Sequence, residues 1–582
     1  MKLQYSDEKN VLLMVALLKA HGLRKVIASP GTTNITFIGS LMHDPFFEIY
    51  SSVDERSAAY MACGMAEESG EPVVLSCTGA TASRNYYPGL TEAYYRKLPV
   101  LAITSTREEC KVGHLIDQQI DRTQQPKDTV VCSEHLQIIK DDEDWWDCTI
   151  KINRAILALT HNGGGPAHIN LPTRYSPKFN VEKLPTVRKI ERIYSFSDLP
   201  AIENRDVAIF IGTHKKMTTQ EQADIDRFCE IYNAVVYCDI CCGYHGKYGL
   251  SMFGASGNTT MDLLIHIGEV SCSAYACKPS EVWRVSEDGE LRDTFRKLTK
   301  VFAMPDSVFF KTYIKDKTIG NPTKFDQYKQ EASKAYVNIQ ETPFSNGWIA
   351  SYLYDKIPEN SAVHLGIVST FHAWNKFMLH PSISVNCNQG GFGIDGNMSS
   401  MIGASLVNPD KLFFCFLGDL AFFYDMNALG NRHVGNNIRI LLVNNGRGVI
   451  FRKPSNLGYL FQEEADKYMA AAGHYGNMSP ALVKNYVESL GFEYISAHSK
   501  EEFKEKASRF LTEEQKSCPM VFEVFVTTED EIKGDSIRRS QHQWLKDKVV
   551  GIIGEEFYDN LRDLVYGGNK GVVIADVGNS KK

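Results

Sequence analysis

Short apolar runs alternate with longer helix-like segments along residues 6–180. The apolar runs lie in "RKVIASPGTTN", "PVVLSCTGAT", "LPVLAITST" and "GGPAHINLP", and each ends in small or turn-forming residues. Short apolar runs bounded by such turns are typical of buried strands. Because strands that alternate with helices form parallel sheets, the pattern predicts an α/β domain here.

The chain starts with "MKLQYSDEKNVLLMVALLKAHG", whose apolar run covers residues 11–18. A run of this length is too short to span a bilayer, and no signal-peptide cleavage pattern follows it. We therefore interpret the segment as an amphipathic helix and expect no contact with a membrane.

Two further blocks follow the first. The segment "SPKFNVEKLPTVRKIERIYSFSDLP" breaks the alternation and is interpreted as a linker, and a second α/β unit then runs through "DVAIFIGTH", "AVVYCDI", "LLIHIGEV" and "TKVFAMP". The polar helical segment "KFDQYKQEASKAYVNIQ" leads into a third block. We predict an α/β protein of three domains, 1–185, 186–340 and 341–582, each with a mostly parallel sheet flanked by helices.

The first and third blocks share a spacing. Val100 follows Gly79 by 21 residues, and Arg439 follows Gly418 by 21 residues, in each case from the end of one apolar run to the next. Helices rich in small residues, "AAYMACGMAEESG" and "GNMSSMIGASLVNP", precede the two pairs of runs. The match predicts that these domains are related to each other.

Composition and charge narrow the class of protein. The 582 residues are 43% hydrophobic and 23% charged, with a net charge of −7 and no basic stripe. These values are typical of a soluble globular protein and make nucleic acid an unlikely partner. The 14 cysteines are scattered without paired metal spacing, so we expect reduced, mostly buried thiols and a cytoplasmic location.

Polar residues end two neighbouring runs of the third block. Asp419 follows "KLFFCFLG", and Asn445, 26 residues later, follows "IRILLV" and Asn444. Parallel strands deliver such residues to the carboxyl edge of a sheet, where open α/β folds bind ligands. Carboxylate and amide oxygens suit Mg²⁺ or Ca²⁺, which commonly bridge to phosphates, so a diphosphate is the expected ligand.

This spacing of Gly-Asp-Leu and Asn-Asn resembles the signature of the thiamine diphosphate (ThDP) enzymes of the 2-oxo acid decarboxylase and acetolactate synthase superfamily. The resemblance implies that Asp419, the side chain of Asn445 and the carbonyl group of Arg447 hold Mg²⁺. Arg447 stands where relatives often have glycine, which puts the geometry of the turn in question. No FAD is expected.

Other segments resemble the same superfamily. Glu55, in "SSVDERSAAYMACGMA", resembles the glutamate that activates the cofactor through N1′ of its aminopyrimidine. Ile394, in "VNCNQGGFGIDGNMSSM", resembles the bulky apolar residue that bends the cofactor. The resemblance extends cofactor binding to Thr78, Asn85, Gly393, Ile394, Gly418, Asp419, Leu420, Ala421, Asn445, Val449 and Ile450.

Within the superfamily, "SPGTTN", "TEAYYRKLPVLAITSTRE", "DQQI" and "GDLAFFYDMNALGN" are most similar to the menaquinone-pathway synthases, which join a succinyl group from 2-oxoglutarate to isochorismate. The resemblance implies a functional role for Gln118. However, those enzymes have arginines where this chain has Thr33 and Gln389, so the substrate pocket is expected to differ. Candidate substrate contacts are Thr32, Thr33, Arg107, His114, Gln389 and Phe451. Arg107 and Arg122 can meet a carboxylate, but the interpretation as surface charges is favoured for both.

We therefore expect a ThDP- and Mg²⁺-dependent lyase or transferase that decarboxylates a 2-oxo acid and passes the resulting carbanion to an acceptor. The acceptor differs from isochorismate and is an aldehyde, a sugar or a second oxo acid. The alternatives are a simple decarboxylase of the phosphonopyruvate type, an acetolactate synthase-like enzyme, and a ThDP-binding regulatory subunit without catalysis. The resemblance also implies a homodimer or homotetramer with the active site between subunits.

Overall fold

The computed structural model describes residues 4–195, 197–202, 204–251, 259–272, 277–336, 342–454, 456–474, 478–514 and 517–534. The chain divides into two compact units: unit 1 comprises residues 1–209, 260–267 and 277–318, and unit 2 comprises residues 210–259, 268–276 and 319–582. The predicted tail beyond residue 534 and the predicted domain boundary at 340/341 lie outside the described residues. The boundary at 185/186 stays a prediction.

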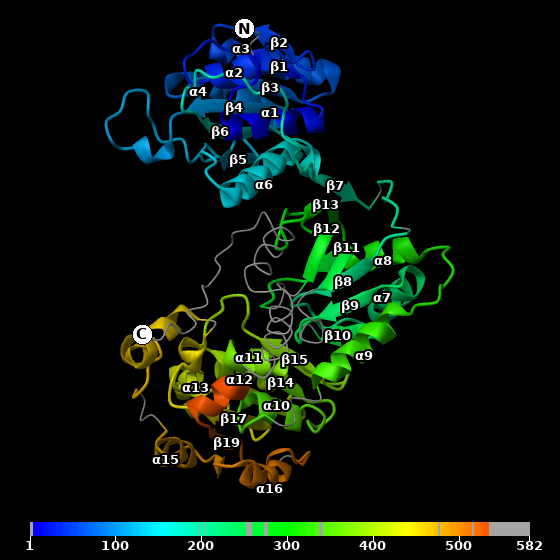
Figure 1. Ribbon diagram of the computed structural model, residues 1–582, viewed down its shortest axis with the longest axis vertical. Helices are drawn as coiled ribbons and strands as arrows, with labels where there is room; N and C mark the ends of the chain where they lie inside the picture. Colours follow the sequence, from blue (N-terminus) through cyan, green and yellow to red (C-terminus); the bar gives the residue numbers. More distant parts are fainter. Residues whose placement is uncertain are drawn as a thin grey trace, which may run out of the picture. The chain divides into compact units, whose positions relative to one another are not determined.

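The first sheet lies in unit 1 (Figure 1). Its strands are β1 (Lys25–Ala28), β2 (Glu48–Ser51), β3 (Val73–Cys77), β4 (Val100–Thr106), β5 (Cys132–His135) and β6 (Ala167–Pro172). The strand order is β2-β1-β3-β4-β6-β5, and all five pairings are parallel. The helices of this domain are α1 (Lys9–His21), α2 (Ile35–Leu41), α3 (Glu55–Ser69), α4 (Thr81–Asn85), α5 (Tyr87–Arg96) and α6 (Asp142–Ala158).

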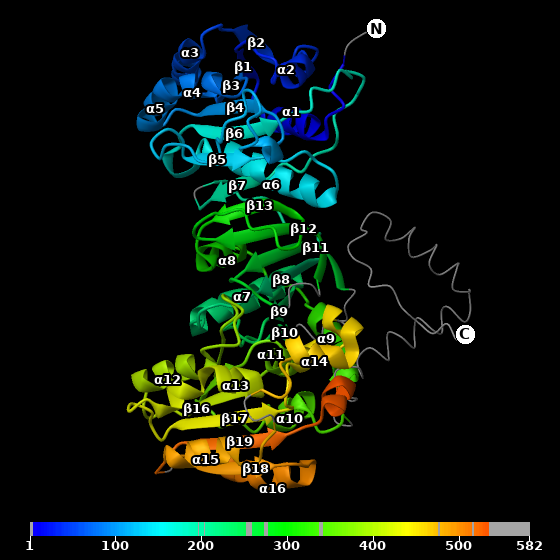
Figure 2. The ribbon, with the colours of Figure 1, turned by 90° about the vertical axis from the view of Figure 1, so that its left-hand side faces the viewer.

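Helices cover both faces of this sheet (Figure 2). Helices α3 and α5 pack on one face with Val73, Leu75 and Ala102, and α1, α2 and α6 pack on the other with Val74 and Ile103. Because alternate residues of a strand point to opposite faces, a sheet buried on both sides needs strands that are apolar throughout. This explains the uninterrupted apolar runs of the sequence.

Helix α1 differs from its prediction. A helix forms where expected, but every residue from Asn10 to Leu18 is buried, so the interpretation as an amphipathic helix is wrong. The reason is tertiary: α1 packs against α2 and α6 as well as the sheet, which leaves no wide face for solvent. Among the described residues, no helix combines the length and the apolar character that a bilayer-spanning segment requires.

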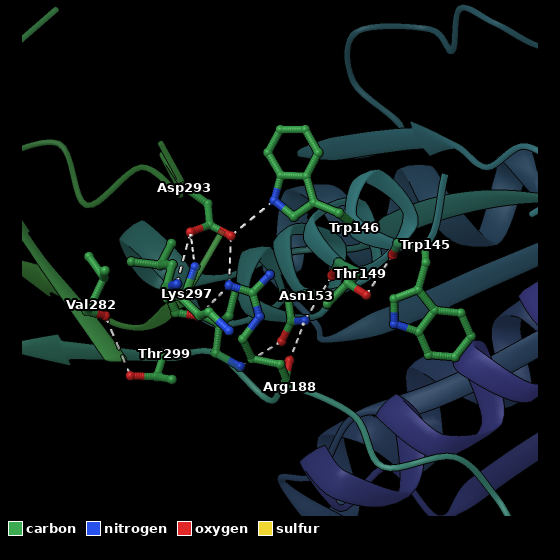
Figure 3. Close-up of polar contacts among 11 residues, drawn as sticks. Trp145, Trp146, Thr149, Asn153, Arg188, Val282, Asp293, Lys297 and Thr299 are labelled. Atoms are coloured by element: carbon green, nitrogen blue, oxygen red, sulfur yellow. Dashed lines mark hydrogen bonds and ion pairs between the residues drawn. The ribbon is translucent and has the colours of Figure 1, made fainter. Parts of the chain in front are cut away.

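The predicted linker is more ordered than expected, because its residues Glu191–Tyr194 form strand β7, which pairs in parallel with β13 (Leu298–Ala303). Asp293 helps to fix the segment: one of its oxygens accepts a bond from Arg188 Nη1 at 2.6 Å and from Trp146 Nε1 at 3.0 Å (Figure 3). Asn153 Nδ2 also donates to the carbonyl oxygen of Arg188 at 3.1 Å. Strand, ion pair and hydrogen bonds therefore hold the segment in a defined position.

The middle strands form a sheet of seven. They are β7, β8 (Val207–Ile211), β9 (Val235–Cys238), β10 (Gly249–Ser251), β11 (Thr259–Ile267), β12 (Cys277–Ser286) and β13, in the order β10-β9-β8-β11-β12-β13-β7. Pairs β9–β10, β12–β13 and β13–β7 run parallel. The accompanying helices are α7 (Thr219–Tyr232), α8 (Asp306–Ile314) and α9 (Lys324–Tyr336).

The third sheet lies in unit 2. Its strands are β14 (Ala362–Leu365), β15 (Ser384–Cys387), β16 (Phe413–Gly418), β17 (Ile438–Asn444), β18 (Glu493–Ala497) and β19 (Met520–Phe525). Its helices are α10 (Asn346–Leu353), α11 (Ser369–Trp374), α12 (Asn397–Val407), α13 (Asp419–Asp425), α14 (Ala465–Tyr468), α15 (Leu482–Ser489) and α16 (Lys500–Phe510). Among its short 3₁₀ helices are η5 (Val449–Arg452) and η6 (Leu457–Glu464).

The third sheet repeats the topology of the first. Its order is β15-β14-β16-β17-β19-β18, all parallel, which matches the first sheet strand for strand when β14 is set against β1. The small-residue helices α3 and α12 occupy the same place in the two repeats, each before the third strand of its domain. The predictions of an α/β fold with parallel sheets and of two related domains are confirmed.

The cysteines also agree with the sequence. All 14 are free thiols, and most of them are buried. Burial without a disulfide is the expected state of structural cysteines that serve as small apolar side chains.

Candidate active site

Asp419 lies at the carboxyl edge of the third sheet. Strand β16 ends at Gly418, and helix α13 starts at Asp419, whose Oδ1 accepts the N–H of Leu420 at 2.8 Å. The side chain is 4% exposed, and burial raises the pKa of Asp419 to about 6, although backbone N–H groups of Leu420, Gly446 and Arg447 oppose the shift. No cationic side chain pairs with it in the described part of the chain. A buried carboxylate without a cation is costly, and a bound metal ion would compensate it.

The turn after β17 faces Asp419. Asn445 is buried, and its Oδ1 accepts the N–H of Arg447 at 3.3 Å. Gly446 carries the left-handed conformation of this turn, with φ of 76°, so the turn does not require glycine at position 447. The side chain of Arg447 is held by Asp466, with Nη1 at 2.6 Å from Oδ2. The carboxylate, amide and backbone oxygens of this corner are the donor types that suit Mg²⁺.

Two further segments flank this corner. Ile394 is half-buried against the apolar cluster that contains Ala421 and Phe422, and its carbonyl oxygen accepts Asn397 Nδ2 at 2.8 Å. An added Cβ at Gly393 would lie 2.3 Å from Oδ1 of the exposed Asp395 side chain, which would have to move. The 3₁₀ helix η5 follows Gly448, which lies near Leu420, and carries buried Val449 and half-buried Ile450 and Phe451. Gly418 and Leu420 are also half-buried. Unit 2 thus contains, in one region, the residues of the third block that were predicted to bind the cofactor.

Glu55 lies at the corresponding edge of the first sheet. It is the first residue of α3, and Asp54 caps the helix by accepting the N–H of Arg56 at 3.1 Å. Glu55 Oε2 accepts a hydrogen bond from Asn85 Nδ2 at 3.1 Å, which joins two predicted cofactor residues from different helices. This approach depends on Gly89, because a Cβ there would lie 2.4 Å from the Cβ of Ala59 on α3.

Thr33 is an interior residue. Its Oγ1 forms a hydrogen bond with Thr78 Oγ1, donates to the carbonyl oxygen of Ser105 at 3.0 Å and accepts the N–H of Gly79 at 3.3 Å. These bonds connect the ends of three strand regions, β1, β3 and β4, and use the hydroxyl within the protein. Thr32, by contrast, is exposed.

Gln389 is also interior, with 1% of its surface exposed. Its Nε2 donates to Thr213 Oγ1 at 3.0 Å and to Asp239 Oδ1 at 3.2 Å, and its Oε1 accepts the N–H of Cys272 at 3.0 Å. All of these residues belong to unit 2. The side chain predicted to contact substrate is therefore bonded to the middle strands instead.

The remaining candidates lie on the segment after β4. Arg107 donates from Nε to the hydroxyl of Tyr175 at 3.1 Å, and its Nη1 lies 3.4 Å from Asp117 Oδ1. His114 and Gln118 are exposed, and Gln118 has a left-handed backbone with φ of 58°. Neither contacts Glu55 or Asn85 through a hydrogen bond in the described residues.

The interpretation of Arg122 as a surface charge is wrong, because the residue is only 3% exposed. It forms a hydrogen bond from Nη2 to Asn170 Oδ1, while Nη1 has no hydrogen-bond partner in the described residues. Burial lowers the pKa of Arg122 to about 10, so the guanidinium remains charged at neutral pH. Its burial depends on a contact with a residue distant in sequence, which local composition does not reveal.

Asp239 is the other polar residue that sequence reasoning missed. It follows β9 in "AVVYCDI", in the same strand-end position that drew attention to Asp419. It is fully buried, and burial raises its pKa. The signal was therefore present, but no family motif marked it.

Comparison with known proteins shows which family the first and third domains resemble. Residues 11–125 match the family described as "Thiamine pyrophosphate enzyme, N-terminal TPP binding domain", and residues 374–524 match the corresponding C-terminal TPP binding domain. A 2-succinyl-5-enolpyruvyl-6-hydroxy-3-cyclohexene-1-carboxylate synthase of Phocaeicola vulgatus is 32% identical over 574 residues, which cover 94% of this chain and 100% of that protein. The enzyme of the same name from Bacteroides thetaiotaomicron is 32% identical over 550 residues, covering 90% of this chain and 96% of that protein. The chain belongs to the family of thiamine pyrophosphate (thiamine diphosphate) enzymes.

Proposed function

We propose that the protein is a ThDP- and Mg²⁺-dependent carboligase that decarboxylates a 2-oxo acid and transfers the remaining fragment to an acceptor. The observation that carries the proposal is Asp419, a buried carboxylate with no cationic partner among the described residues, beside the turn of Asn445 and Arg447. Family membership supplies the cofactor, and this corner supplies donors for the metal ion. The retained Glu55 argues against a regulatory subunit without catalysis.

The residues fit the two ends of the cofactor. Asp419, Asn445 and the carbonyl group of Arg447 would hold Mg²⁺ and, through it, the diphosphate. Ile394, Val449 and Ile450 provide apolar surface for the rings of the cofactor. When bound, ThDP supplies a nucleophilic carbon that attacks the keto group and accepts the electrons released as CO₂ leaves.

Glu55 has the role of a proton carrier toward the aminopyrimidine. Asn85 Nδ2 bonds only one of the two carboxylate oxygens, Oε2, in the described residues, so Oε1 remains available to a ring nitrogen. The bond from Asn85 orients the carboxylate without neutralising it. Glu55 therefore acts on cofactor activation, whereas Asp419 acts on cofactor retention.

The substrate pair is proposed to be less anionic than the pair used by the menaquinone-pathway synthases. Thr33 and Gln389 stand where the resemblance predicts arginines, and both side chains form their hydrogen bonds inside the protein. Loss of two charge-assisted bonds of roughly 1.5–3 kcal/mol each would weaken transition-state binding by about 3–6 kcal/mol. This corresponds to about two to four powers of ten in rate. The reaction named for the relatives is the second candidate, because 32% identity extends over nearly the whole chain.

A second copy of the chain is proposed to complete the site. In unit 1, Tyr60 and Met61 are exposed on α3, the helix that Glu55 begins, Tyr95 is exposed on α5, and Leu115 is fully exposed. In unit 2, Leu457, Leu460 and Tyr468 are exposed close to η5 in the sequence. Exposed apolar groups on the elements that carry predicted cofactor residues are typical of an interface, so we propose a homodimer or homotetramer.

The proposed function is tested by an assay of the purified protein with ThDP and Mg²⁺. Donors are pyruvate and 2-oxoglutarate, and each is tested alone, with aldehyde acceptors, and with isochorismate. We expect ThDP-dependent CO₂ release, with the isochorismate pair slower than the best alternative by two powers of ten or more. Equal turnover of the isochorismate pair would instead assign the reaction named for the relatives, and no CO₂ release from any donor would reject catalysis of this class.

A further inference from the structure

The loop that carries Gly393 and Ile394 is rich in glycine, and its own side-chain bonds run from Asn388 Nδ2 to the Gly396 carbonyl oxygen at 3.3 Å and from Asn397 Nδ2 to the Ile394 carbonyl oxygen at 2.8 Å. It contains "NQGGFGIDG", and added Cβ atoms at Gly390 and Gly391 would meet nothing within 4 Å. Phe392 and Gly396 adopt left-handed backbone conformations, with φ of 56° and 81°. Such a segment needs bonds from outside to keep one conformation.

Gln389 supplies those bonds at the start of the loop. Its amide reaches three strand ends of the middle sheet: Thr213 after β8, Asp239 after β9 and Cys272 after β11. Its own N–H donates to the carbonyl oxygen of Cys387 at 2.7 Å, which continues the connection into β15. Both ends of the amide are thus used, and neither is free for a ligand.

Asp239 is the centre of this arrangement. Its Oδ1 accepts the N–H of Cys241 at 2.8 Å, and its Oδ2 accepts the hydroxyl of Ser271 at 2.5 Å. Gln389 Nε2 lies 3.2 Å from Oδ1 and 3.4 Å from Oδ2, so the amide faces both oxygens of the carboxylate. A buried carboxylate requires donors, and Gln389 is a donor that comes from another segment of the chain.

We propose that Asp239 and Gln389 act as one positioning unit that fixes the cofactor loop on the middle sheet and keeps position 389 away from the substrate. Neither residue touches the reacting atoms; both act through the loop that carries Ile394. The idea also explains the neutral residue at position 389, since an arginine there would pair with the carboxylate of Asp239. The inference rests on the proposed function only for its effect on turnover, because the restraint of the loop can be measured without it.

The first experiment exchanges the two chemical groups. In Gln389→Glu, two buried carboxylates face each other, and such a pair shares one proton with a raised pKa. We expect hydrogen exchange of the peptide spanning residues 388–398 to become at least tenfold faster at pH 8 and to return toward wild type at pH 5.5. The double variant Asp239→Asn/Gln389→Glu restores one donor and one acceptor, so its exchange should stay within about threefold of wild type at both pH values.

The control is Gln220→Glu, which makes the same change in a Gln–Asp pair outside the loop. Gln220 Nε2 donates to Asp224 Oδ1 at 2.8 Å on α7. Exchange in the 388–398 peptide should not change in this variant. Other titratable groups close to Asp239 are the thiols of Cys238, Cys241, Cys272 and Cys387, and the pKa of each thiol is raised, so they remain protonated over this range.

The second experiment tests the effect on substrate choice. Gln389→Arg alone should not improve turnover of an anionic acceptor, because Asp239 binds the guanidinium, whereas Gln389→Arg/Asp239→Asn should improve it at least tenfold over wild type. Improvement in the single variant, or unchanged loop exchange in Gln389→Glu at pH 8, would overturn the inference. Wild-type protein without ThDP-dependent turnover but with the expected exchange pattern would reject the proposed function and leave the positioning unit intact.

Discussion

The carboxyl edges of the first and third sheets have the same strand order and opposite buried charges. Within the part of the chain that the structure describes, the third sheet presents Asp419, a buried carboxylate without a cationic partner, and the first presents Arg122, a buried guanidinium without a carboxylate partner. Burial raises the pKa of the acid and lowers that of the arginine, as desolvation requires. Two domains with the same strand order can therefore bury side chains of opposite charge. The strand order determines the position of the carboxyl edge, but it does not determine which side chains lie there.

The same contrast separates two tasks. We propose that in unit 2 Asp419 and Asn445 retain the cofactor through a metal ion, whereas in unit 1 Glu55 activates it. If this division is correct, variants at the two edges will differ in kind: one edge will affect binding and the other a proton-transfer step.

The largest effect is expected for Glu55, at the carboxyl edge of the first sheet. Glu55→Gln should slow hydrogen–deuterium exchange at C2 of bound ThDP by about 10²–10⁴-fold, the usual contribution of a general acid–base group. The affinity for ThDP should change little, because the group does not anchor the diphosphate. Exchange is followed by NMR after acid quenching. The control is Glu68→Gln, an exposed residue of the same helix, and equal exchange rates in Glu55→Gln and wild type would remove Glu55 from the mechanism.

The next largest effect is a pH dependence of folding stability, caused by Asp419 at the carboxyl edge of the third sheet. Because the folded-state pKa of Asp419 is raised from 3.8 to about 6, the ligand-free folded protein binds this proton more tightly than the unfolded chain does. The contribution is present below about pH 4 and is lost as pH rises through about 6, with a size of about 3 kcal/mol. The free-energy difference in urea between Asp419→Asn and wild type should therefore grow by that amount from pH 4 to pH 7.

A pH-independent difference between those two proteins would contradict the burial of an unpaired carboxylate. The matched control is Asp410→Asn, an exposed acid that precedes the other end of the same strand region. The affinity of the wild-type protein for ThDP and Mg²⁺ should have the opposite pH dependence. It should fall below about pH 6, because the metal ion requires the deprotonated carboxylate.

The smallest effect concerns the bond that orients Glu55. Asn85→Ala removes a single hydrogen bond at 3.1 Å, which is worth about 1 kcal/mol in typical cases. We expect C2 exchange to slow about fivefold, in the same assay, with Asn85→Asp slower still because it places a second carboxylate beside the first. A change in Asn85→Ala as large as that in Glu55→Gln would show that the amide has a direct role.

The fold was predictable from the sequence because its signals are local. Uninterrupted apolar runs ending in turns predicted parallel strands, and equal spacings predicted the repeat. Local patterns failed where tertiary contacts decide: α1 is enclosed on all sides, and β7 forms within an apparent linker because it pairs with β13, more than a hundred residues away.

The candidate site divides in the same way. Asp419, Asn445 and Glu55 follow strand ends and a motif, so their positions were predictable, while their roles remain predictions. The interior positions of Thr33, Gln389 and Arg122 were not predictable, because each depends on partners far away in the chain, such as Ser105, Asp239 and Asn170. The resemblance to the menaquinone-pathway synthases suggested substrate contact for Thr33 and Gln389, and the charge of Arg122 suggested a surface position.

The proposed role of Asp419 in cofactor retention is tested most directly by calorimetric titration of ThDP into wild type, Asp419→Asn and Glu55→Gln, each with and without Mg²⁺. We predict Mg²⁺-dependent binding by wild type, similar binding by Glu55→Gln, and affinity reduced by about 10² or more in Asp419→Asn, corresponding to about 3 kcal/mol for a lost buried charge interaction. Unchanged affinity in Asp419→Asn, or wild-type binding that is indifferent to Mg²⁺, would contradict the assignment of cofactor retention to this edge of the third sheet.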